Sequence, residues 1–252
     1  MLSLPAALLR RLQFALFPGD RLPVVRRLPE TTTDVGLSFD DGPTPETTPS
    51  LIALLNRHGA RATFFLPGER AILAPDLLRA LVEAGHDIFP HGWRHIRYGR
   101  QPVDQMIRDL DRAEALLSKV RPTPSPYLVR LPYGSGHKDP RVHRAIRTWR
   151  PDAQIAHWNY VMWDWKFADG CSEESQVERR CATAAERAIN RPAVRGSILL
   201  LHEKPFDVSA PFNARVAPLL TSALLSRMSS RGLRGRPVAP LPVNGAGAGK
   251  AP

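Results

Sequence analysis

Two adjacent carboxylates, Asp40 and Asp41, are the first candidates for chemistry in this sequence. They follow the apolar run 35–39 and precede Gly42-Pro43, so they fall where a strand ends and a loop begins. Because successive strand side chains point to opposite faces, one carboxylate could bind a metal while the other acts as a base. A turn without any chemical role would use the same residues, since Asp-Gly and Pro are common in turns.

Two histidines, His91 and His95, form the second candidate group. A spacing of four residues places both rings on one face of a helix, where they can bind a single metal ion. Pro90 and Gly92 leave the local conformation open. With Asp41 the histidines would complete the ligand set of a catalytic zinc site that keeps one position for water.

Three further polar residues follow apolar runs. Arg130 could hold a carboxylate such as Asp40 by a bidentate contact and keep it ionised, although a surface ion pair would use the same residue type. His202 ends the run 198–201. If Asp164 accepts a hydrogen bond from its ring, His202 can act as a general acid; without that partner it would be a structural histidine.

Strands and helices alternate along the chain. Apolar periodicity and Gly/Pro boundaries predict strands at residues 35–39, 62–66, 86–89, 127–131, 154–159 and 196–201, and helices at 45–57, 73–84, 103–119, 140–148, 173–189 and 216–230. This alternation predicts a parallel sheet with crossover helices, either a barrel or a doubly wound sheet. In such folds the sites lie at the carboxyl ends of the strands, where all the candidate residues fall.

Composition limits the alternatives. With 252 residues, of which 43% are hydrophobic, the chain is long enough for one large domain. The net charge of +11 is compatible with anionic partners, but the arginines are scattered and form no basic stripe with interleaved aromatics, so nucleic-acid binding is not predicted. Cys171 and Cys181 make no disulfide framework or zinc motif, and whether they pair is left open.

The two ends of the chain differ from its middle. We predict an amphipathic N-terminal extension over residues 1–32, a catalytic domain over 33–233 and a disordered Pro/Gly/Ala tail over 234–252. The first apolar segment has no preceding positive residue and is interrupted by Arg10 and Arg11, which argues against a secretory signal, and no run is long enough to span a membrane. A cytoplasmic or membrane-surface location, with peripheral membrane contact through the N-terminus, is favoured over secretion. The sequence does not predict the oligomeric state.

The candidate residues also occur in a characteristic order. This order strongly resembles the five motifs of the polysaccharide deacetylase family, also called the NodB-homology domain or carbohydrate esterase family four. The resemblance covers about residues 33–230 and rests on Phe39-Asp40-Asp41-Gly42-Pro43, His91-x-x-x-His95, Arg130-x-Pro132-Tyr133, Asp164-Trp165 and Leu199-x-Leu201-His202.

The resemblance implies a single α/β domain built as a distorted (β/α)-barrel, with one divalent metal. Zinc is the expected ion, although cobalt, nickel, manganese or iron would accept the same ligands. The implied roles are Asp41, His91 and His95 as metal ligands; Asp40 as the base, with Arg130 as its partner; His202 as the acid, held by Asp164; the Tyr133 backbone N–H in the oxyanion hole; and Trp165 and Leu201 as walls of the acetyl pocket.

The implied activity is hydrolytic removal of N-acetyl groups from N-acetylglucosamine-type sugars in chitin oligomers or peptidoglycan, by attack of water held at the metal. The alternatives are deacylation of a lipid-linked or small amino sugar, O-deacetylation of xylan, and a degenerate domain that only binds carbohydrate. The sequence departs from the family pattern at two positions. Gly92 replaces the usual Ser or Thr, and Val161 replaces an Asp found in many members.

Overall fold

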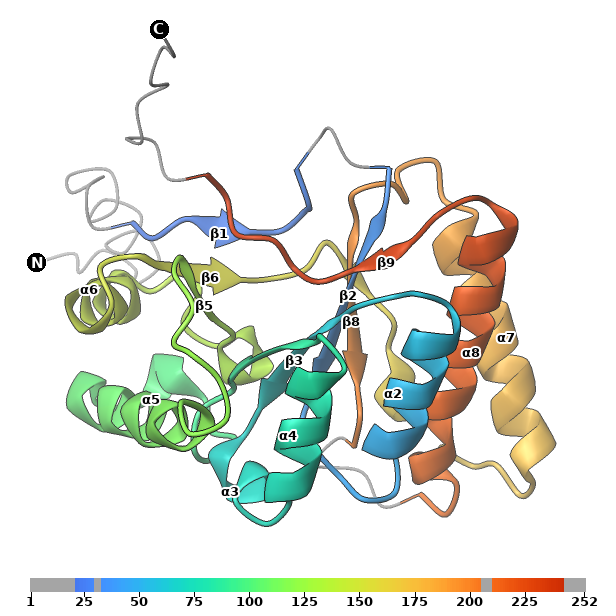
Figure 1. Ribbon diagram of the computed structural model, residues 1–252, viewed down its shortest axis with the longest axis horizontal. Coiled ribbons are helices and arrows are strands. Elements are labelled where there is room, and N and C mark those ends of the chain that lie inside the picture. The colour runs from blue at the N-terminus through green and yellow to red at the C-terminus, as the bar shows by residue number, and fades with distance from the viewer. Residues whose placement is uncertain (1–20, 30–32, 205–209, 243–252) are drawn as a thin grey trace, which may run out of the picture.

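Two parallel sheets form the centre of the computed structural model, which describes residues 21–29, 33–204 and 210–242 (Figure 1). In the larger sheet the strand order is β4-β3-β2-β8-β7, with β9 also paired to β2, and in the smaller it is β1-β6-β5. The strands are β1 (Val24–Val25), β2 (Val35–Asp40), β3 (Thr63–Leu66), β4 (Asp87–Pro90), β5 (Tyr127–Val129), β6 (Ala153–Ala156), β7 (Tyr160–Val161), β8 (Ile198–His202) and β9 (Gly235–Arg236).

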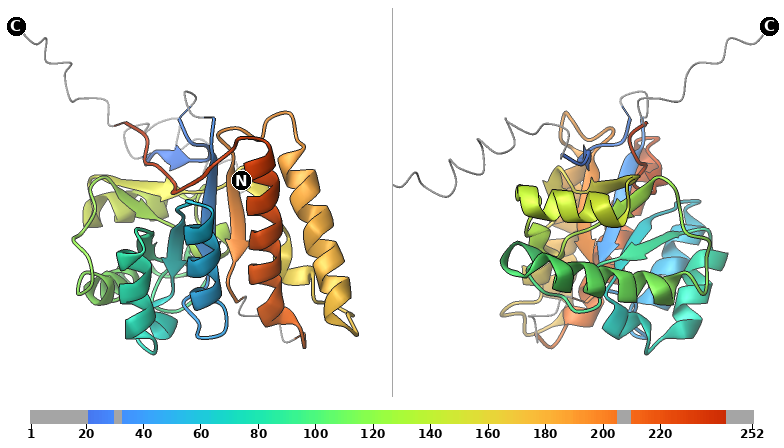
Figure 2. Two further views of the ribbon diagram at one scale, coloured as in Figure 1. Left: turned by 45° about the vertical axis from the view of Figure 1, so that its right-hand side comes forward. Right: turned by 90° about the vertical axis from the view of Figure 1, so that its left-hand side faces the viewer.

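Helices cover the outside of these sheets (Figure 2). In Figure 1, α2, α7 and α8 lie on one side and α5 and α6 on the other. The helices are α2 (Thr48–Arg57), α3 (Gly68–Ala71), α4 (Pro75–Glu83), α5 (Val103–Leu117), α6 (Pro140–Trp149), α7 (Glu174–Ile189) and α8 (Asn213–Ser230), with single 3₁₀ turns η2 (Tyr98–Arg100), η3 (Pro132–Gly134) and η4 (Asp164–Lys166).

The strands β2 to β8 follow one another around a distorted barrel, which confirms the expected fold. The pairing of β8 with β2 closes one side, and Asp40 lies directly opposite His202 in that ladder. Contacts without a described ladder join β4 to β5. Every residue of β2 is buried, as expected for a parallel strand that is covered on both faces. The barrel therefore brings the carboxyl ends of its strands to one end of the molecule.

The predicted domain boundaries at residues 33 and 233 require correction. β1 pairs with β6, and Leu22, Val25 and Leu28 are buried, so the domain begins before residue 33. Beyond residue 233, β9 pairs with β2, and the Gln154 side chain forms hydrogen bonds with both the N–H and the carbonyl of Leu241. Short strands of this kind are stabilised by tertiary pairing, which sequence periodicity does not reveal.

The predicted amphipathic segment at the N-terminus and the rest of the predicted disordered tail fall in residues 1–20 and 243–252, which lie outside the described residues. None of the helices in the described part of the chain is both long and apolar enough to cross a bilayer. Cys171 and Cys181 are both buried and carry free thiols.

Candidate active site

A pocket of about 800 Å³ opens at the carboxyl ends of the strands, where all five sequence motifs converge. The motifs are far apart in sequence, and only the barrel brings them together. The predicted site residues that line the pocket are Asp40, Asp41, His91, His95, Tyr133, Trp165 and His202. Arg130 and Asp164 lie behind this lining, where each contacts a residue of the pocket wall.

Asp41, His91 and His95 form a compact group that could hold a metal ion. One ligand atom from each lies within 4.8 Å of the others. Asp41 Oδ1 is 3.4 Å from His95 Nε2 and 3.8 Å from His91 Nε2. The histidines come from an irregular loop after β4, not from a helix, so the loop conformation brings the two rings together.

Hydrogen bonding shows that these residues suit a cation. His91 Nδ1 lies 3.0 Å from the Arg130 carbonyl oxygen, which can only accept, so Nδ1 carries the proton and Nε2 presents its lone pair. Asp41 Oδ1, which faces this nitrogen, is buried and has no hydrogen-bond partner among the described residues. Two buried acceptors that face each other at this distance fit a positive ion between them.

Burial also shifts the protonation equilibria of these groups. It raises the pKa of Asp41 to about 7, an effect that the His202 charge opposes and the Asp40 charge strengthens. Burial lowers the pKa of His91 to about 3, which keeps the ring neutral, as metal binding requires.

The loop that carries the histidines is held by the carboxylate of Asp109 on α5. Asp109 Oδ2 accepts hydrogen bonds from the backbone N–H of Trp93 at 2.7 Å and from the Tyr98 hydroxyl at 2.7 Å, and Oδ1 accepts from the N–H of Arg94 at 3.3 Å. At Gly92, where φ is 78°, a β-carbon would lie 2.3 Å from the Tyr98 hydroxyl. Tyr98 therefore occupies the space that a side chain at position 92 would need.

Asp40 is held by Arg130, as predicted. Arg130 Nη1 donates to the two carboxylate oxygens of Asp40 at 3.0 and 3.2 Å, and Nη2 donates to Ser38 Oγ at 3.1 Å. The Arg130 side chain is fully buried, and its guanidinium lies over the ring of Phe65. A buried, charge-assisted pair of this kind orients the carboxylate strongly.

His202 and Asp164 form the second predicted pair. His202 Nδ1 lies 2.9 Å from Asp164 Oδ1, which leaves Nε2 as the ring nitrogen without this bond. Burial disfavours the charged ring and is the largest single effect, but the carboxylates of Asp164, Asp41 and Asp40 together outweigh it and raise the pKa of His202 to about 9. The edge of the Trp165 ring system packs against His202 with the ring centroids 5.0 Å apart.

Backbone strain is concentrated around the pocket. Among the described residues, the non-glycine residues with positive φ are Asp41, Tyr133 and Trp163, and all of them line it. Such conformations are unfavourable for residues with a β-carbon and gather at functional sites. The structure places the Tyr133 ring 4.3 Å from the ring of His95, at the edge of the metal group.

The prediction of one wall residue of the acetyl pocket is wrong by one position. Leu201 does not line the pocket but packs in the hydrophobic core, whereas Leu200 forms part of the pocket wall. In a strand, residues two apart share a face, so Leu200 lies on the same face as His202 and Leu201 on the opposite one.

Comparison with known proteins identifies the family. A family model for polysaccharide deacetylase matches residues 28–148. The chitooligosaccharide deacetylase of Sinorhizobium fredii is 30% identical over 233 residues, which cover 89% of this chain and 99% of that protein. The chain belongs to the polysaccharide deacetylase family.

More distant members agree with this assignment. The peptidoglycan-N-acetylmuramic acid deacetylase PdaC of Bacillus subtilis is 28% identical over 67% of this chain, which spans about a third of the length of PdaC (32%). The crystal structure of the Bc1960 peptidoglycan N-acetylglucosamine deacetylase superposes with a TM-score of 0.69 at 20% identity and covers 94% of this chain and 95% of that one. At 20% identity, the likeness to the Bc1960 structure shows a shared fold.

Several residues that line the pocket were not predicted from the sequence. The Arg97 guanidinium lies 3.8 Å from the centroid of the Tyr133 ring, and Trp158, Val161 and Trp163 also line the pocket. Arg97 follows the His91-x-x-x-His95 motif closely, and Trp163 precedes Asp164. Proximity to a motif was therefore the available signal for these two residues.

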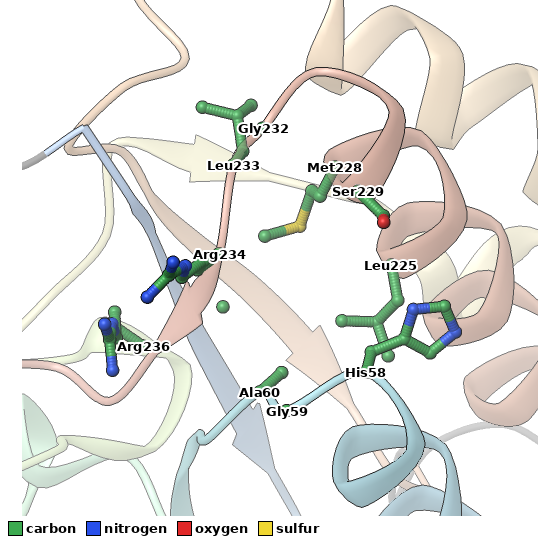
Figure 3. A pocket seen from close by; sticks show the side chains of 11 residues that line it. His58, Gly59, Ala60, Leu225, Met228, Ser229, Gly232, Leu233, Arg234 and Arg236 are labelled. Carbon is green, nitrogen blue, oxygen red and sulfur yellow. The ribbon is translucent and has the colours of Figure 1, made fainter.

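A separate pocket of about 490 Å³ lies at the other end of the barrel (Figure 3). It is bounded by the ends of α2 and α8 and by β9, which pairs with the first residues of β2, whereas Asp40 is the last residue of β2. Its lining includes His58, Arg234 and Arg236 but no carboxylate from the described part of the chain. It therefore plays no part in the chemistry at Asp40.

Proposed function

We propose that this polysaccharide deacetylase hydrolyses the N-acetyl group of N-acetylglucosamine-type sugars in chitin oligomers or peptidoglycan. The observation that carries the proposal is the position of two charged pairs around one pocket. The Asp40–Arg130 pair provides a base, the His202–Asp164 pair provides an acid, and Asp40 and His202 are register partners in the β2–β8 ladder. A base and an acid that face one reacting bond are the requirement for amide hydrolysis.

We assign the metal position to Asp41, His91 and His95, and zinc to that position, because two imidazoles and a carboxylate are a common catalytic zinc set. A zinc ion there would lower the pKa of water and polarise the acetamide carbonyl. Asp40 takes the proton from the attacking water, and the hydrogen bonds from Arg130 hold its carboxylate in position at the pocket. We assign the backbone N–H of Tyr133 to the oxyanion that forms as the new C–O bond is made.

His202 completes the reaction. As the C–N bond breaks, Nε2 donates its proton to the departing nitrogen, because an amide anion is too basic to leave unprotonated. The products are acetate and a free amino sugar. An ester would release an alkoxide that the same acid can protonate, so the choice of substrate distinguishes N-deacetylation from O-deacetylation of xylan.

Exposed aromatic side chains at the rim of the pocket support the proposal that the substrate is a sugar. Trp163 is 54% exposed and lies 5.0 Å from Trp165 between ring centroids, and Tyr133 is 40% exposed. Exposed aromatic rings at the mouth of a polar pocket provide flat apolar surfaces on which sugar rings can stack. The names of the relatives, which describe chitooligosaccharide and peptidoglycan deacetylases, agree with such a substrate.

The test is acetate release from chitooligosaccharides, peptidoglycan, acetylxylan and a lipid-linked amino sugar. The protein is stripped of metal and then loaded with zinc, cobalt, nickel, manganese or iron, and Asp40→Asn is the control. We expect zinc-dependent release from the first two substrates that is lost in the variant. Release from acetylxylan alone would replace the proposal with an esterase. Absence of release from every substrate, with no metal bound, would contradict the enzyme assignment.

A further inference from the structure

A second hollow adjoins the active-site pocket. Gly134, the residue after Tyr133, lines both the pocket and this hollow, which has a volume of about 1370 Å³. The hollow, here called the basic groove, is bounded by residues 21–26, by Gly99 and Arg100 of η2, and by residues 134–139 with His143 of α6. A substrate that extends from the pocket past Gly134 would enter the groove.

The groove is strongly positive. Its lining includes the cationic side chains of Arg21, Arg26, Arg100 and Lys138. Burial lowers the pKa of His137 and His143, which also line the groove, so these two rings are neutral. Among the described residues, Asp139 is the one carboxylate in the lining, and it is already compensated, because it accepts from the backbone N–H of Arg141 at 3.0 Å and forms an ion pair with that guanidinium at 2.8 Å. Positive charge lining a concave surface concentrates anions there.

One of these cations is held next to the pocket. Arg26 Nη1 lies 2.9 Å from His157 Nδ1. Burial lowers the pKa of His157 to about 3, so the ring is neutral, and the Trp158 carbonyl oxygen lies 3.1 Å from the same Nδ1. His157 Nε2 is buried and lies 3.6 Å from the position of a β-carbon on Gly134. The Arg26 guanidinium is thus held beside the junction of pocket and groove.

We propose that the basic groove binds an anionic substituent, a carboxylate or a phosphate, on a sugar next to the one that is deacetylated. This inference rests on the proposed function, because it places the anion on the same substrate. A neutral chitin chain offers nothing that matches the groove. Arg26 and Arg100 can each bind the paired oxygens of a carboxylate or phosphate, and Lys138 adds a point charge. The groove therefore selects a charged glycan over a neutral one.

The test measures binding separately from turnover. Three tetrasaccharides are titrated by calorimetry into the zinc-loaded Asp40→Asn variant at low and at high salt. They are chitotetraose, an alternating N-acetylglucosamine and N-acetylmuramic acid chain that carries carboxylates, and chitotetraose with a terminal phosphate. Within this background, Arg26→Gln with Lys138→Gln removes charge from the groove. Arg57→Gln with Arg187→Gln removes the same charge from exposed positions on α2 and α7, on the other side of the molecule (Figure 1).

We expect at least one anionic tetrasaccharide to bind about tenfold more tightly than chitotetraose at low salt, and the anion that does so identifies the source of the charge. High salt should reduce this preference. The groove pair of substitutions should abolish this preference, whereas the control pair should preserve it. Thermal melting of both pairs checks that each remains folded.

Equal affinity for all three tetrasaccharides would overturn the inference, as would an equal loss in the control pair, which would show general charge attraction only. Acetate release by the wild-type protein is measured in parallel. Acetate release without any preference for an anionic substrate would contradict anion binding in the groove but not the proposed function. A preference for an anionic substrate without acetate release from any substrate would contradict the proposed function but not anion binding in the groove.

Discussion

Asp164 binds His202 at two atoms. One carboxylate oxygen lies 2.9 Å from the ring Nδ1, and the other accepts from the backbone N–H of His202 at 2.6 Å. The second contact fixes the carboxylate relative to strand β8, so the first fixes the ring. This arrangement determines which ring nitrogen is available for proton transfer and how readily it holds its proton.

Substitution Asp164→Asn should lower the rate at alkaline pH more than at neutral pH. Burial lowers the pKa of His202, but the Asp164 charge, helped by Asp41 and Asp40, raises it to about 9, and an acid must be protonated to act. Removal of the charge lowers that pKa, so the alkaline limb of the kcat/KM profile should move to lower pH. At its maximum, kcat should fall by about 10²-fold or more.

The measurement is acetate release from chitotetraose between pH 6 and pH 10. Asp169→Asn is the matched control, because Asp169 is an exposed carboxylate that also lines the pocket. An unchanged alkaline limb in Asp164→Asn would show that His202 is not the proton donor.

Asp109 should control metal affinity although it touches no metal ligand directly. Its carboxylate accepts from two backbone N–H groups between His91 and His95 and from the Tyr98 hydroxyl. In Asp109→Asn the amide group can no longer accept at both oxygens, so the loop should become less ordered. We expect zinc affinity to fall by about 10- to 100-fold, the range typical of residues that support metal ligands.

Zinc competition with a chelating dye measures this effect. Tyr98→Phe removes one hydrogen bond and should lower affinity less. Asp111→Asn, on an exposed position of the same helix, should not change it. Unchanged affinity in Asp109→Asn would mean that the loop keeps its conformation without the carboxylate.

Trp163 should contribute to substrate binding and not to the chemical step. Its ring system is exposed beside Trp165 at the pocket rim and forms no contact with Asp40 or His202 among the described interactions. For Trp163→Ala we expect KM for chitotetraose to rise by about five- to tenfold, because a stacking surface is lost, with little change in kcat. Trp163→Phe should retain most of the affinity. A loss confined to kcat would place Trp163 in the catalytic machinery.

Much of the site could be predicted because sites in α/β folds lie at the carboxyl ends of the strands, and those ends can be recognised from the local sequence. Each candidate residue follows an apolar run, and the barrel gathers the ends of such runs. The Leu201 assignment was wrong because it ignored strand alternation: His202 faces the pocket, so the wall residue is Leu200, two positions earlier.

The supporting contacts could not be predicted in this way. Asp109 meets Trp93 across 16 residues only because the loop takes a positive φ at Gly92 and Tyr98 fills the adjacent space. Nothing in the spacing of these residues indicates that contact. β1 and β9 have two residues each, too few for alternation to be recognised, and are defined by their partners β6 and β2.

Glu203, the residue after His202, should make the protein less stable as pH rises. It is 1% exposed, and its Oε2 accepts from the hydroxyls of Thr47 and Thr48 at 3.1 and 2.5 Å. Oε1 is buried with no hydrogen-bond partner among the described residues. Burial therefore raises the pKa of Glu203 from 4.5 to about 7, against the opposing effect of the two hydroxyls.

The sign of the effect follows from proton linkage. Between about pH 4.5 and pH 7 the folded protein holds a proton on Glu203 that the unfolded chain has lost, so folding stability falls as pH rises through this window. The full shift corresponds to roughly 3 kcal/mol. Glu203→Gln keeps an oxygen acceptor for Thr47 and Thr48 and cannot ionise.

The variant should therefore melt at nearly the wild-type temperature at pH 5 and at a higher temperature at pH 8. A difference of about 5 to 10 °C is expected for a domain of this size. Thermal unfolding of metal-free protein at both pH values measures it, and Glu178→Gln on the exposed face of α7 is the control for a change in net charge. A gain that is equal at pH 5 and pH 8 would show that the folded protein does not hold a proton on Glu203 in this pH window.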